Sequence, residues 1–203
     1  MPVVVLVSGS GTNLQALIDA SQGNATPWQI VAVGADRPGI AGLERAESAG
    51  IPTFVCPVKD YPQRSEWDTA LADHLMNALP EAHDGRRWVV SAGFMKVLGT
   101  TVLNEFTVLN THPALLPAFP GAHGVRDAMA YGAKVTGATL HFVDEGVDTG
   151  PIVSQRIVAI NDDDTEDSLH ERIKVAERDM LVRGLTSLLS TGFTLSDRKV
   201  TLL

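Results

Sequence analysis

Five short apolar runs constrain the fold of this chain more than any other feature. They are rich in β-branched residues and cover residues 3–8, 29–35, 52–57, 88–93 and 107–112. A continuous run such as "VVVLVS" is typical of a strand buried on both faces of a parallel sheet. The segments between the runs have helical periodicity, which indicates repeated βαβ units. The sequence therefore predicts an α/β fold of the Rossmann-like type, an open twisted sheet that is mostly parallel, with helices on both faces.

The segment that starts at Ser65 illustrates the helical pattern. Ser65 and Asp68 match the capping-box spacing, so we expect them to cap the start of a helix. Trp67, Leu71 and Leu75 follow at spacings of four and form one apolar stripe. That stripe should pack on the sheet.

The pattern changes after residue 132. Two strand-like runs flank an acidic, glycine-rich turn, which predicts an antiparallel extension and hence a mixed sheet. A long helical segment follows, with the aspartates at 162–164 expected to cap it and Gly192 expected to end it. Residues 193–203 could form a short hairpin. A chain of 203 residues can bury its own core, so one domain spanning residues 1–203 is the default.

Composition excludes some classes of function. The formal net charge of −8 argues against non-specific binding to nucleic acid or to an anionic membrane surface. Cys56 is the only cysteine and lies in an apolar run, so we expect it to be buried and not paired in an intrachain disulfide. The start of the chain has no basic region and no apolar run long enough for a leader or a membrane span. We therefore expect a cytoplasmic protein that contacts neither nucleic acid nor a membrane.

The glycine-rich stretch "SGSGTNLQALI", residues 8–18, runs from a strand through a turn into a helix. This geometry aims backbone N–H groups at an anion, so a phosphate could bind there. Leu14 stands where a dinucleotide fingerprint needs a third glycine, and no Walker A lysine follows. The simpler alternative is a tight turn without a ligand. A nicotinamide-dependent oxidoreductase that uses this turn and Asp36 also stays open.

Asn110 and His112 follow a strand at its carboxyl end, where open α/β sheets place ligand sites. Three prolines within residues 113–120 restrict the loop that follows. Asp148, in an acidic turn, could supply a carboxylate. An amide donor, an imidazole and a carboxylate suit transfer of an acyl-type group to an amine. The sequence contains no nucleophile elbow, which favours direct attack without an acyl-enzyme.

Simpler readings of these residues remain. A lone loop histidine is more often structural, and an acidic turn can be a solvated hairpin tip. A metal site has little support, because the histidines lack zinc-ligand spacing and no H-E-x-x-H motif occurs.

Four stretches together resemble the glycinamide ribonucleotide formyltransferase family: "SGSGTNLQALI", "SAGFMKVL", "NTHPALLPAFPGAH" and "GATLHFVDEGVDTGPIVSQ". The likeness spans nearly the whole chain. It implies a cytoplasmic enzyme of de novo purine synthesis that moves the formyl group of 10-formyltetrahydrofolate, its cosubstrate, to the amine of glycinamide ribonucleotide. It also implies that no metal takes part.

The resemblance implies roles for individual residues. Asn110 and protonated His112 would bind the oxyanion of the formyl carbon, and Asp148 would support the charge of His112 and help to relay the amine proton. Thr139 would place a hydroxyl near this triad. No role is implied for His123.

The resemblance also implies binding residues. The N-terminal half would bind the substrate phosphate, and the C-terminal half would bind folate and carry the catalytic residues. The substrate would contact Gly11, Thr12, Asn13, Arg64, Lys174 and Glu177. The folate would contact Met95, Lys96, Val97 and Leu98 together with Val143, Asp144, Glu145 and Val147 of the acidic turn.

The formyl acceptor is less constrained than the chemistry, because related formyl-transfer enzymes share the N-x-H and D-x-G elements. A methionyl-tRNA formyltransferase would carry a further C-terminal domain, and a formyltetrahydrofolate deformylase an N-terminal regulatory domain. We expect neither in a chain of this length. A non-catalytic nucleotide-binding module is a further alternative. A homodimer is one assembly to consider, since two-fold dimers are the commonest oligomers.

Overall fold

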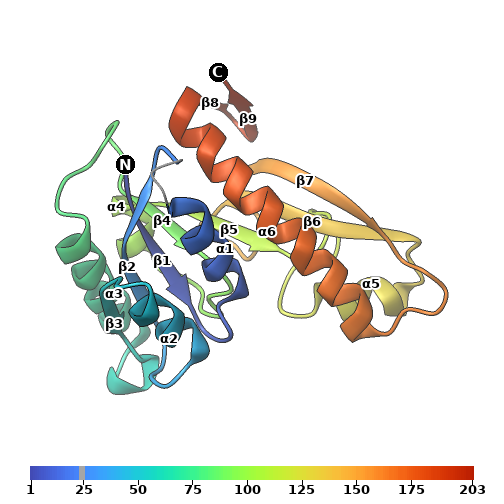
Figure 1. The fold of residues 1–203 in the computed structure, drawn as a ribbon, viewed down its shortest axis with the longest axis horizontal. Coiled ribbons are helices and arrows are strands. Elements are labelled where there is room, and N and C mark those ends of the chain that lie inside the picture. The colour runs from blue at the N-terminus through green and yellow to red at the C-terminus, as the bar shows by residue number, and fades with distance from the viewer. Residues whose placement is uncertain (23–25) are drawn as a thin grey trace. The chain divides into compact units, whose positions relative to one another are not determined.

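The computed structural model of the chain describes residues 1–22 and 26–203 (Figure 1). Contacts within the chain divide it into two compact units, Met1–Leu109 and Asn110–Leu203. Strand β5 (Thr107–His112) runs across the boundary between these units. The expectation of one domain over residues 1–203 stays a prediction.

The first unit contains a parallel sheet. Its strands are β1 (Pro2–Val7), β2 (Gln29–Ala35), β3 (Thr53–Val55) and β4 (Trp88–Ser91), in the order β3-β2-β1-β4. All three pairings in this set are parallel. Five consecutive β1 residues, Val3 to Val7, are fully buried, as expected of a central strand covered on both faces. The apolar runs thus form strands as predicted, with ends that differ from the predicted ones by at most two residues.

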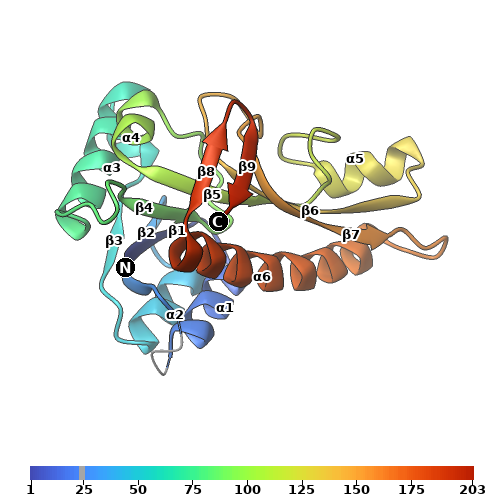
Figure 2. The ribbon, with the colours of Figure 1, turned by 90° about the horizontal axis from the view of Figure 1, so that it is seen from above.

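Helices cover both faces of this sheet. They are α1 (Thr12–Ser21), α2 (Ala41–Ser48), α3 (Arg64–Ala78) and α4 (Thr100–Glu105), with a short 3-10 turn η1 (Val58–Asp60) before α3. Figure 2 shows α1 and α2 on one face and α3 and α4 on the other. The doubly wound arrangement is therefore confirmed.

Helix α3 confirms one prediction and corrects another. Its apolar stripe of Trp67, Leu71 and Leu75 is buried as expected. The predicted capping box is wrong, because the N-cap residue is Gln63, which makes no side-chain cap, and Ser65 lies inside the first turn. The Asp68 carboxylate instead accepts hydrogen bonds from the backbone N–H groups at the start of α4. Asp68 thus caps another helix and not its own.

The second unit contains an antiparallel pair, β6 (Val135–Phe142) with β7 (Ile152–Ala159), and a C-terminal hairpin of β8 (Phe193–Ser196) and β9 (Lys199–Leu202). Strand β9 pairs with β7 in parallel. The antiparallel extension and the terminal hairpin are both confirmed. The fold class is also as predicted, an α/β fold with an open, mixed and mostly parallel sheet.

Two helices complete the second unit, α5 (Gly124–Tyr131) and the long α6 (Glu166–Thr191), which packs against β6 and β7 (Figure 1). Thr165 caps α6 through a capping box with Ser168, so the aspartate run does not supply the cap as predicted. Asp164 instead accepts a hydrogen bond from Ser168 Oγ and pairs with Arg172. Gly192 follows the helix at a φ of 78°, which agrees with its predicted role as the stop.

Two further observations concern the whole described chain. Cys56 is buried, as expected. Among the residues that the structure describes, no helix combines the length and the apolar character needed to cross a bilayer.

Candidate active site

The second unit brings His112 and Asp148 together. His112 ends β5, and Asp148 lies in the turn after β6 with a φ of 55°. The Nδ1 atom of His112 is 3.3 Å from Asp148 Oδ2. Both side chains are largely buried, so the surrounding dielectric constant is low and the interaction is stronger than it would be in water.

Both ring nitrogens of His112 face acceptors. Nε2 is 2.8 Å from the carbonyl oxygen of Phe119, and Nδ1 faces the Asp148 carboxylate. A neutral imidazole has one N–H and could donate to only one of them, whereas the cation donates to both. The geometry therefore suits a protonated His112. Donation from Nε2 to a substrate oxygen would require the Phe119 carbonyl to give way.

The position of Asp148 is determined by contacts within its turn and with the loop after β5. Its Oδ2 accepts from the backbone N–H of Gly121 at 2.8 Å. Asp144 folds the turn, since its Oδ1 accepts from Thr149 Oγ1 at 2.6 Å. Gly150 has no room for a side chain, because a Cβ there would lie 1.7 Å from the carbonyl oxygen of Phe142. The carboxylate is thus placed before any reaction begins.

His141, on β6, is a site residue that sequence reasoning missed. Its Nδ1 is 2.9 Å from the Phe142 carbonyl, so Nδ1 carries the hydrogen and Nε2 accepts from Asn110 Nδ2 at 3.2 Å. Burial lowers the pKa of His141, although the nearby Phe142 carbonyl and the Asp148 carboxylate oppose that shift. Asp148 Oδ1 lies 3.7 Å from Nε2. A neutral His141 therefore orients the Asn110 amide and connects it to the His112–Asp148 pair.

A signal for His141 was present in the sequence. Residues two apart in a strand share a face, and His141 is two residues after Thr139, which was expected near the triad. Without the strand order, however, nothing indicated that β6 lies beside β5 and brings His141 to Asn110.

Thr139 organises the backbone that follows His112. Its hydroxyl donates to the Ala114 carbonyl at 2.7 Å and accepts from Leu116 N–H at 3.0 Å. Gln155, from β7, donates both to Thr139 Oγ1 at 3.0 Å and to the Leu116 carbonyl at 2.8 Å. These bonds, and not the prolines alone, hold the start of the loop. Gln155 was not identified from the sequence.

Glu177 and Lys174, both on α6, were expected to contact substrate. Glu177 is buried, and burial raises its pKa to about 7, while a hydrogen bond from Thr111 lowers it. Thr111 lies between Asn110 and His112 in β5, so Glu177 belongs to the surroundings of the triad. Lys174 pairs with Glu171 at 2.7 Å.

The glycine turn in the first unit has the backbone that anion binding requires. Gly11 has a φ of 68° and precedes α1. A Cβ at Gly11 would lie 2.7 Å from Gly42 Cα, so only glycine fits. Thr12 and Asn13 form the first turn of α1, where backbone N–H groups have no carbonyl partner within the helix.

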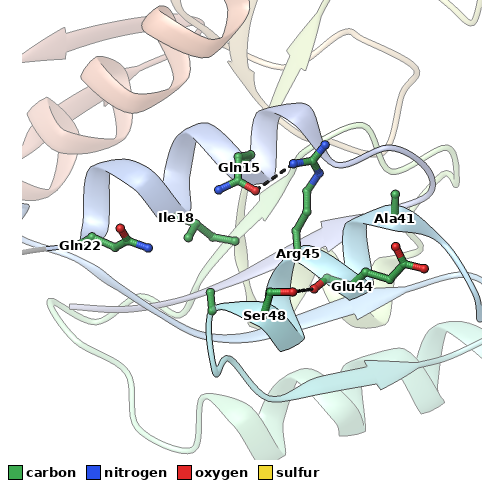
Figure 3. Close-up of a pocket in the computed structure, with 8 residues that line it drawn as sticks. Gln15, Ile18, Gln22, Ala41, Glu44, Arg45 and Ser48 are labelled. Atoms are coloured by element: carbon green, nitrogen blue, oxygen red, sulfur yellow. Dashed lines mark hydrogen bonds between the residues drawn. The ribbon is translucent and has the colours of Figure 1, made fainter.

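Arg45, from α2, places a positive charge beside this turn and was not identified from the sequence. Its Nε donates to the Ser10 carbonyl at 2.8 Å, and its Nη1 donates to Gln15 at 2.9 Å (Figure 3). A hollow of about 420 Å³ lies between α1 and α2 and includes Gln15 and Arg45 in its lining. No local sequence pattern connects Arg45 with the turn 35 residues earlier.

The segment expected to contact folate in the first unit alternates between exposed and inward-facing residues. Met95 and Val97 are exposed, whereas Lys96 pairs with Asp36 and Leu98 is buried. Arg64 donates to the Val97 carbonyl, and its guanidinium lies 4.0 Å from the centre of the Trp67 ring. In the second unit, Glu145 and Val147 of the acidic turn are exposed, and Val143 is half-buried.

Two alternatives lose support. The Asp36 side chain is fully buried and paired with Arg37 and Lys96, so it offers no oxygen to a nicotinamide nucleotide. Within the described residues, no group of three or more His, Cys, Asp or Glu side chains could hold a metal ion. The absence of a metal requirement stays a prediction. His123 lies at the start of α5 without a side-chain cap and gains no role.

Comparison with known proteins agrees with this chemistry. The family model described as formyl transferase matches residues 1–185. The chain belongs to the formyl transferase family. Within this family, it is 50% identical over 202 residues to the phosphoribosylglycinamide formyltransferase of Mycobacterium tuberculosis, covering 98% of this chain and 90% of that protein.

Other members of the formyl transferase family are also similar. The trifunctional purine biosynthetic protein adenosine-3 of Drosophila melanogaster is 43% identical over 192 residues, which are 93% of this chain and 14% of that protein. The crystal structure of glycinamide ribonucleotide transformylase 1 from Symbiobacterium toebii superposes with a TM-score of 0.93 at 37% identity, covering 100% of this chain and 94% of that one.

Proposed function

We propose that this formyl transferase moves the formyl group of 10-formyltetrahydrofolate to the amine of glycinamide ribonucleotide in de novo purine biosynthesis. The observation that carries the proposal is the His112–Asp148 pair at 3.3 Å, with Asn110 oriented by His141, in a chain that is 50% identical to a phosphoribosylglycinamide formyltransferase.

The proposed reaction is a direct transfer. The amine nitrogen forms a bond to the formyl carbon, giving a tetrahedral oxyanion, and the bond from that carbon to the folate nitrogen then breaks. The amine loses a proton and the folate nitrogen gains one, so the products are the formamide and tetrahydrofolate. Asn110 and His112 donate to the oxyanion, while Asp148 stabilises the charge of His112 and relays the proton. An oxyanion donor of this kind contributes about 3 kcal/mol to transition-state stabilisation.

The binding assignments are part of the same proposal. The ribose phosphate occupies the turn at Gly11 to Asn13, with Arg64, Lys174 and Glu177 as further substrate contacts. Folate contacts residues 95–98 and the turn residues 143–145 and 147. Two features support the assignments: the left-handed glycine of the first turn, and the exposed apolar side chains of Met95 and Val97. A cytoplasmic location and a homodimeric state stay predictions.

A spectroscopic turnover assay tests the proposal. The enzyme is mixed with a 10-formyl folate whose deformylated product absorbs differently, and glycinamide ribonucleotide is then added. The proposal predicts release of the deformylated folate only when glycinamide ribonucleotide is present. Release without this acceptor would indicate a deformylase, and no release at micromolar enzyme would reject the proposal.

A further inference from the structure

The segment 94–99, here called the 94–99 loop, exposes apolar side chains on an ordered backbone. Met95 is 70% exposed and Val97 is 56% exposed, while Phe94 and Leu98 on either side are buried. Two exposed apolar side chains separated by one inward-facing residue form an edge suited to a flat, largely apolar ring. Met95 and Val97 can both contact such a ring only while the side chain between them stays turned inward.

That intervening residue is Lys96, and Asp36 holds it. Lys96 Nζ lies 2.8 Å from Asp36 Oδ2, and the Asp36 side chain is 0% exposed. Asp36 also accepts a hydrogen bond from the Ser8 side chain. Ser8 Oγ in turn accepts from the backbone N–H of Met95 at 2.9 Å. One carboxylate at the end of β2 thus holds two consecutive residues of the loop.

The rest of the 94–99 loop is anchored as well. Arg64 donates to the carbonyl of Val97, and Asp68 accepts from Gly99 N–H at 2.7 Å. A Cβ at Gly99 would lie 2.5 Å from Asp68 Oδ2, so the Asp68 carboxylate can approach the backbone this closely only because residue 99 is glycine. With Asp36 included, charged side chains fix the loop at several successive positions. Little ordering entropy then remains to be lost when a ligand binds.

We propose that Asp36 is a positioning residue for the folate cosubstrate, because its ion pair with Lys96 holds the 94–99 loop so that Met95 and Val97 form the apolar edge. The identity of the ligand rests on the function proposed above. If either partner of this ion pair lost its charge, residues 95–97 would lose the anchor. A folate ring would then have to bind to a displaced loop.

Kinetics of two variants test this role. Asp36→Asn and Lys96→Met should each raise KM for the formyl folate at least about tenfold, because a small displacement of a binding surface is costly. KM for glycinamide ribonucleotide and kcat should change by less than about twofold, because neither residue reaches the reacting atoms. In the double variant, KM for the formyl folate should be no higher than the higher of the two single-variant values, since both changes break the same interaction.

A control variant separates positioning from general stability. Arg37→Gln removes the other cation on Asp36, but the Arg37 side chain is 52% exposed, and the hydrogen bonds it makes within the described residues go to Asp36. Its KM for the formyl folate should stay within about twofold of wild type. Equal effects of Arg37→Gln and Lys96→Met would overturn the proposal. If Asp36→Asn fails to fold, Lys96→Met carries the test.

Failure of the inference can be told from failure of the proposed function. Normal turnover by wild type with an unchanged folate KM in folded Lys96→Met would overturn the inference alone. If wild type does not turn over, the proposed function fails, and calorimetry with a non-transferable folate analogue decides the inference. Binding at least about tenfold weaker in Lys96→Met would support the role of Asp36. Equal binding, or no binding to either protein, would overturn it.

Discussion

The Nδ1 atom of His112 lies 3.3 Å from the Oδ2 atom of Asp148, and the opposite ring nitrogen of His112 lies 2.8 Å from a carbonyl oxygen. Acceptors on both sides fit an imidazolium. A cation beside a developing oxyanion is what formyl transfer requires, so this pair is the centre of the proposed mechanism.

We predict that Asp148→Asn lowers kcat at least about a hundredfold, as does His112→Ala, because the charge pair or the cationic donor is lost. Steady-state rates with saturating substrates provide the measurement. Asp127→Asn, on α5 and paired only with its neighbour Arg126 among the ion pairs of the described residues, is the matched control and should retain full activity. A loss of less than tenfold in both site variants would remove them from the mechanism.

His141→Leu should lower kcat about tenfold, because the Asn110 amide loses the acceptor that fixes its orientation. His141→Gln can place an oxygen near the former Nε2 and should keep most of the activity. NMR of the imidazole nitrogens should find His141 neutral at about pH 7 with the hydrogen on Nδ1, as burial lowers its pKa. Equal activity of wild type and the leucine variant would show that Asn110 needs no such support.

Asp36 should make the free energy of unfolding fall at acid pH. Burial raises the pKa of its carboxyl, but hydrogen bonds from Arg37, Lys96 and Ser8 outweigh this effect and hold the pKa at about 2, below the usual 3.8. The stabilisation is complete above about pH 4 and is lost as the pH falls toward 2, by roughly 2 kcal/mol in all. Urea unfolding over this range should therefore show a smaller acid loss in Asp36→Asn. Asp19→Asn, on the exposed side of α1, should behave like wild type.

Glu177 should have the opposite effect on the pH dependence of stability, with stability lost as the pH rises. Burial raises its pKa from 4.5 to about 7, so between these values the folded chain binds more protons than the unfolded chain. The free energy of unfolding then falls as the pH rises through this window, by roughly 3 kcal/mol. Glu177→Gln should lose this slope and be more stable than wild type at about pH 8. An unchanged slope in the glutamine variant would show that another group is responsible. Glu171→Gln, exposed on the same helix, is the control.

The strands of this fold were predictable because a strand that is buried on both faces appears in the sequence as a continuous run of apolar residues. The stripe of Trp67, Leu71 and Leu75 was predictable for the same local reason. The cap of α3 was not, since Asp68 matches a local motif but binds Gly99 and Thr101, more than thirty residues away. Local patterns cannot rank a local partner against a distant one.

The residues of the candidate site differ in the same way, because some lie in local motifs and others are connected only through distant parts of the chain. Asn110, His112 and Asp148 belong to short motifs, and a family resemblance could assign them roles. His141 and Gln155 are identified only when the pairing of β6 and β7 and the hydrogen bonds of the loop are seen. The link between Asp36 and Lys96 joins residues sixty positions apart, and no periodic pattern connects them.

Transfer of an isotopically labelled formyl carbon tests the central claim most directly. The labelled 10-formyl folate is incubated with glycinamide ribonucleotide and either wild type or Asp148→Asn, and the product is analysed by NMR and mass spectrometry. The proposed mechanism predicts that wild type places the label on the amine of glycinamide ribonucleotide and that Asp148→Asn does so at least about a hundredfold more slowly. Label recovered as free formate, or left on the folate by the wild-type protein, would contradict the claim.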